Sequence, residues 1–135
     1  MPADAGTITL LENTKFYGIQ IIKVTWLAAA GNFEQDVPVS TFGRLVQIAH
    51  APGATAPTLD SDLAVFDERD IAEAAGLVTA AGDGLNLIST GFKFKAMAAP
   101  APYVAGKVRL QVTGNVVAAA TGTIYLYVEE MRRAR

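Results

Sequence analysis

Apolar and polar residues alternate with a period of two along much of this chain. In residues 107–113, Val108, Leu110 and Val112 alternate with polar side chains, and residues 123–129 repeat the pattern with Ile124, Leu126 and Val128. This alternation predicts β-strands that bury one face and expose the other. We expect the two segments to lie side by side as a central hairpin, joined by the loop "VTGNVVAAATG".

Five further segments are rich in β-branched and aromatic residues, which strands prefer. They span residues 7–11, 19–27, 41–50, 61–66 and 92–95. Stretches with Gly, Pro, Asn or Asp, such as "AAAGNFEQDVP" and "HAPGATAPT", separate them and predict turns. The sequence therefore predicts an all-β fold, an antiparallel β-sandwich or jelly-roll-like barrel of about seven or eight strands. We expect residues 1–135 to form one domain, with at most one short helix or turn, in residues 69–82.

The composition limits the classes of function. The chain has 135 residues, of which 51% are hydrophobic and 18% charged, and it contains no cysteine. It is too apolar for a disordered protein. A net charge of −2 gives no basic field for nucleic acid, so we expect no nucleic-acid partner. Disulfides and cysteine-containing zinc sites are excluded.

No membrane or targeting segment is expected. The start of the chain, "MPADAGTITLLENT", lacks a basic region followed by an apolar stretch. The longest apolar run, "GIQIIKVTWLAAAG", is interrupted by Gln20, Lys23 and Thr25 and is too short to cross a bilayer. We expect a soluble protein without a membrane partner.

Catalytic and metal sites have weak support in the sequence. His50 is the one histidine, and no nucleophile motif accompanies it. The carboxylates of "DSDLAVFDERD" could in principle bind calcium, but their spacing does not match an EF-hand loop. Side chains that alternate between two faces of a strand do not converge on one ion, so a solvated turn is favoured. We expect no catalytic residue, no metal and no cofactor.

Tyrosines point to a subunit contact instead. If Ile124, Leu126 and Val128 face the core, Tyr125 and Tyr127 face outward, and tyrosine is enriched at protein interfaces. Tyr103, together with Trp26 and Phe33, either joins this surface or packs in the core. The final "RRAR" is either a solvated tail or an arm for an acidic partner.

Two stretches resemble small β-sandwich structural proteins of tailed bacteriophages. In "HAPGATAPTLDSDLAVFDERDIAEAAG" the matching residues are Pro57, Asp62, Leu63, Val65, Asp67, Asp70, Ile71 and Gly76. In "PYVAGKVRLQVTGNVVAAATGTIYLYVEE" they are Pro102, Gly106, residues 108–112, Gly122 and residues 124–128. The chain departs from the family pattern where "DERD" lacks the usual turn glycine.

The resemblance implies a non-enzymatic virion protein, foremost a capsid decoration (cement) protein that binds the major capsid protein and stabilises the head. It implies synthesis in the host cytoplasm, a place on the capsid surface and a homo-oligomer, expected as a trimer. Asp67 and Asp70 would then face a neighbouring subunit, and Tyr125, Tyr127 and Tyr103 complete the candidate interface.

Three alternatives remain open. One is a carbohydrate- or host-binding β-sandwich module, in which Trp26 or Tyr103 would stack on a sugar ring. Another is a tail or head–tail accessory protein. A small hydrolase or isomerase on a jelly-roll scaffold has the least support, because His50 alone cannot form the histidine cluster that binds the metal in such scaffolds.

Overall fold

The computed structural model describes residues 6–28, 33–55, 57, 62–66, 85–86, 93–96, 103–113 and 115–130. These residues form eight strands and no helix, which confirms the predicted all-β fold. The strands are β1 (Gly6–Phe16), β2 (Ile19–Ala28), β3 (Phe33–Pro52), β4 (Asp62–Phe66), β5 (Leu85–Asn86), β6 (Lys93–Ala96), β7 (Tyr103–Thr113) and β8 (Thr121–Glu130). The helix or turn predicted in residues 69–82 lies outside the described residues.

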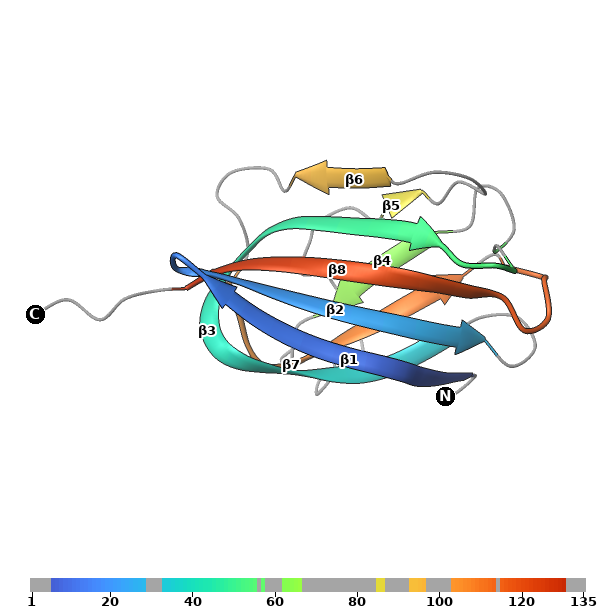
Figure 1. Ribbon diagram of the computed structural model, residues 1–135, viewed down its shortest axis with the longest axis horizontal. Coiled ribbons are helices and arrows are strands. Elements are labelled where there is room, and N and C mark those ends of the chain that lie inside the picture. The colour runs from blue at the N-terminus through green and yellow to red at the C-terminus, as the bar shows by residue number, and fades with distance from the viewer. Residues whose placement is uncertain are drawn as a thin grey trace, which may run out of the picture.

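The strands form two antiparallel layers that share β3 (Figure 1). In the first layer the strand order is β1-β2-β8-β3-β6, and the second half of β3 takes part. In the second layer the first half of β3 pairs with β7, which is followed by β4 and β5. The result is a β-sandwich in which one long strand passes from one layer to the other.

The strand β3 is longer than its sequence pattern indicates. We expected a strand over residues 41–50 and a loop over the preceding segment, but β3 begins at Phe33. Its register shifts between Val39 and Gly43, where its pairing changes from β7 alone to β7 and β8. Pro38 lies in the first half, which among the described strands pairs with β7 alone and forms an edge there. An edge strand tolerates proline, because the missing N–H is not needed for pairing on the open side.

Alternation along the strands places the core between the layers. On β2 and β8 every second residue is buried, as the period of two predicts. The largest fully buried apolar side chains come from both layers: Trp26, Phe33, Ile22, Leu45, Ile48, Leu63, Leu110, Ile124 and Leu126. The inward assignment of Ile124, Leu126 and Val128 is therefore confirmed.

The predicted hairpin between β7 and β8 is wrong. β8 pairs with β2 on one side and β3 on the other, whereas β7 pairs with β3 and β4. The loop between them crosses from the second layer to the first. It is held by Asn115, whose side-chain amide donates to the carbonyl of Val117 while its Oδ1 accepts the Val117 N–H, each at 3.1 Å. A loop of this length can connect strands of different layers as well as two paired strands. The fact that β7 and β8 are consecutive in the sequence therefore did not make them neighbours in a sheet.

Candidate interface on the outer face of the first layer

Tyr125 and Tyr127 lie on the outer face of β8, as predicted, and each is half-buried. In the cross-strand register Tyr127 lies opposite Ile21 of β2 and Gln47 of β3. β8 is the middle strand of the first layer (Figure 1). The two tyrosines therefore lie at the centre of its outer face.

Tyr125 has its own neighbours on this face, on the two strands beside β8. Its cross-strand neighbours are Lys23 on β2 and Ala49 on β3. Ala49 is fully buried although it lies on the outer face. We call the set formed by Ile21, Lys23, Gln47, Ala49, Tyr125 and Tyr127 the tyrosine face. It combines apolar surface with hydroxyl and amide groups, which suits contact with another protein more than acid–base chemistry.

The outer face of the second layer has a different chemistry. Arg109 of β7 donates from Nε to Oδ1 of Asp36 at 2.7 Å and from Nη2 to Oδ2 at 3.4 Å, and its Nη1 donates to Glu34 at 3.3 Å. Lys107 Nζ lies 3.3 Å from Asp36 Oδ2. The hydrogen bond from Arg109 holds the pKa of the Asp36 carboxyl below its usual value, and Asp36 in turn raises the pKa of Arg109. These charges compensate each other within the chain and join β3 to β7.

His50 and Trp26 form a buried pair between the layers. The indole Nε1–H of Trp26 donates to Nε2 of His50 at 3.3 Å, and the ring of Phe33 lies 5.2 Å from that of Trp26, centroid to centroid. Burial lowers the pKa of His50 to about 4, because a charged imidazolium loses its hydration in the core. The hypothesis that Trp26 stacks on a sugar ring is wrong, since Trp26 is 0% exposed. Phe33 likewise belongs to the core and not to a surface.

Gly122 of β8 borders this buried pair. A Cβ at this position would lie 2.9 Å from Trp26 Nε1 and 2.9 Å from His50 Cε1. We expect Gly122→Ala to lower the free energy of unfolding by about 1–3 kcal/mol, because an added methyl group overpacks the core. Urea denaturation measures the change. Thr123→Ala, on the outer face one residue later, is the control with a smaller expected effect; equal stabilities of the Gly122 variant and the parent would contradict the close approach.

The structure brings together only part of the predicted site. Asp67 and Asp70 lie outside the described residues. The backbone of Tyr103 begins β7 and pairs with Arg44 of β3, but its side chain is not among those described. Sequence analysis did not identify Ile21 and Gln47 as neighbours of Tyr127, because cross-strand register between distant segments leaves no local signal.

Two further findings concern groups of metal-binding side chains and long apolar helices in the described part of the chain. It holds no group of three or more His, Asp or Glu side chains arranged to bind a metal ion. None of its elements is a helix long and apolar enough to cross a membrane.

Comparison with known proteins leaves the family open. The sequence matches no protein-family model, and no curated protein gives a significant match.

Proposed function

We propose that this protein is a non-enzymatic structural protein of a virion, a capsid decoration protein that binds the major capsid protein through the tyrosine face and stabilises the head. The observation that carries the proposal is the position of Tyr125 and Tyr127, half-buried at the centre of a sheet face. The resemblance to phage structural proteins supports the identity of the partner and the place on the capsid surface, with synthesis in the host cytoplasm.

The contrast between the two outer faces supports the choice of docking surface. The face with Arg109 and Asp36 already pairs its charges within the chain, so a partner would gain little there. Tyr125 and Tyr127 place large rigid rings on the outer face of the first layer, and such residues contribute much of the binding energy at interfaces. Asp67, Asp70 and Tyr103 remain predicted members of the interface, and the trimer remains a prediction.

The test is a double variant, Tyr125→Ser with Tyr127→Ser. If the tyrosine face docks on the capsid, we expect the affinity for particles lacking this protein to fall at least about tenfold, because two central aromatic contacts are lost. Co-sedimentation with such particles measures the binding, and urea denaturation checks that the fold is kept.

A matched control comes from the opposite layer. Gln111 lies on the outer face of β7, half-buried and opposite Glu34, so Gln111→Ser should leave particle binding unchanged. Unchanged binding by the tyrosine double variant, or an equal loss in both variants, would refute the tyrosine face as the docking surface.

A further inference from the structure

The strand β1 forms one border of the first layer. Among the described strands it pairs only with β2, and it is the first strand in the hydrogen-bonded order (Figure 1). Side chains of both faces are exposed along it, from Leu11 to Lys15 without interruption. An edge strand of this kind presents main-chain donors and acceptors to which another strand can pair.

Leu11 shows that the core side of this border is also open. It lies opposite Val24 in the register, and since Val24 points into the core, Leu11 points to the same side of the sheet. Val24 is 0% exposed, whereas Leu11 is 42% exposed. A second strand beside β1 would therefore cover apolar surface as well as pair main-chain groups.

The turn before β2 determines which main-chain groups face outward. Tyr17 and Gly18 both have positive φ, 51° and 83°, the pattern of a type I′ two-residue hairpin turn, which closes on a hydrogen-bonded pair of Phe16 and Ile19. Hydrogen-bonded and non-hydrogen-bonded pairs alternate along antiparallel strands. The main-chain N–H and C=O of Lys15 and Leu11 therefore point away from β2, toward the border.

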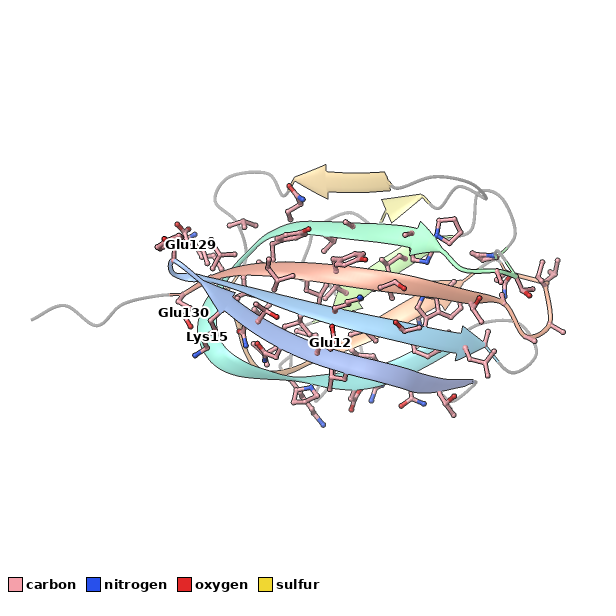
Figure 2. All side chains as sticks on the ribbon, viewed as in Figure 1. Glu12, Lys15, Glu129 and Glu130 are labelled. Carbon is pink, nitrogen blue, oxygen red and sulfur yellow. The ribbon has the colours of Figure 1, made fainter. Side chains whose placement is uncertain are left out.

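We propose that two copies of this protein pair through β1, antiparallel, about a two-fold axis at Asn13. The part of β1 without a register shift spans residues 10–16, and Asn13 is its middle residue, so this register uses the whole regular segment. Leu11 of each copy then lies opposite Lys15 of the other. The aliphatic stem of Lys15 covers the exposed Leu11, while its ammonium group keeps its ion pair with Glu130, 3.1 Å away (Figure 2).

Other symmetric registers are less favourable. An axis at Glu12 or at Lys15 would place identical charges directly opposite each other, which destabilises a strand pair. An axis at Thr14 would shorten the pairing to residues 12–16. An axis at Leu11 would extend into the register irregularity near the start of the strand. The proposed axis avoids all three problems, so β1 can pair with a second copy of itself without a like-charge contact.

The pairing goes beyond the proposed function and does not depend on it, because β1 lies at the border of the layer and the tyrosine face at its centre. A two-fold contact uses the same surface on both copies and closes after two. Pairing of one short edge buries less than the roughly 1,200 Å² of a stable interface. The pair is therefore reversible, and its population rises with protein concentration.

The test compares two variants at one position, Leu11→Glu and Leu11→Lys. Both remove the same leucine, but in the proposed register the glutamate faces Lys15 of the second copy and the lysine faces a like charge. We expect the dissociation constant of the Leu11→Lys pair to exceed that of the Leu11→Glu pair by about tenfold, because two symmetry-related contacts change. Sedimentation equilibrium at low salt measures both constants, and urea denaturation confirms that both variants fold.

Added salt supplies a second measurement. The ratio of the dissociation constants of the two variants should decrease in 1 M NaCl, where exposed charges are screened over about 3 Å. A parent protein that stays monomeric up to high micromolar concentration, or two variants with equal dissociation constants, would each overturn the β1 pairing. Particle binding by these variants is measured separately, so failure of the pairing leaves the docking proposal to its own test.

Discussion

Replacing Leu126 with alanine is expected to lower the free energy of unfolding by about 2–5 kcal/mol. Leu126 is 1% exposed and lies in the middle strand of the first layer, opposite Ile22 and Ile48. The loss combines the removed apolar contact with a cavity that the surrounding side chains fill only in part. Urea denaturation, read as the midpoint at constant slope, measures it.

A matched control is Leu27→Ala on β2. Leu27 alternates with the buried Trp26 and Ala28 and lies half-buried on the outer face, so the same chemical change there should cost clearly less. If the Leu126 variant unfolds at the same urea concentration as the parent, the core described between the two layers is wrong.

Stability is expected to fall by about 3 kcal/mol as the pH decreases from about 6.5 to about 4, because of His50. Its pKa in the folded protein is about 4, below the value of 6.5 for an unburied histidine. Between these values the unfolded chain binds a proton that the folded chain excludes, so lowering the pH favours unfolding. The stabilisation by neutral His50 is complete above about pH 6.5, declines through this window, and does not decline further below about pH 4.

The physical cause is specific to the buried pair. His50 Nε2 accepts the Trp26 N–H, so a proton on Nε2 would break this hydrogen bond and place a charge in the core. Unfolding free energies at several pH values, for the parent and for His50→Gln, measure the effect. The difference between the two profiles should vary between pH 4 and 6.5, and a constant difference would contradict the assignment. The pKa of Asp36 is lowered by its hydrogen bond from Arg109, so the ionised carboxylate stabilises the folded protein. This stabilisation is lost only as the pH falls below the usual pKa of 3.8.

Which side of a strand each residue faces followed from the sequence. The period of two placed Leu126 inward and Tyr125 and Tyr127 outward, and the structure agrees on all three. This worked because the direction of a side chain on a strand depends only on its immediate neighbours in the chain. The all-β class followed for the same reason, since the turn residues and the alternation are both local.

Two expectations that failed, and one surface that sequence reasoning missed, depend on distant parts of the chain. β8 lies between β2 and β3 and not beside β7, because long-range register and the passage of β3 between layers set the pairing. Trp26 carries no sign in the sequence that its ring meets His50 in the core. In the sequence, Leu11 resembles a leucine that points into the core. It is exposed because β1 lies at the border of the first layer.

Most of the strands, their inner and outer faces and the absence of cysteine chemistry thus followed from the sequence alone, whereas the full length of β3 and the short strand β5 did not. The tertiary structure decided which strands are neighbours, which aromatic residues reach the surface and where the sheet ends. The physical reason is that strand formation and side-chain alternation are short-range properties of the backbone, whereas hydrogen-bonded neighbours are selected by packing the whole set of apolar faces together.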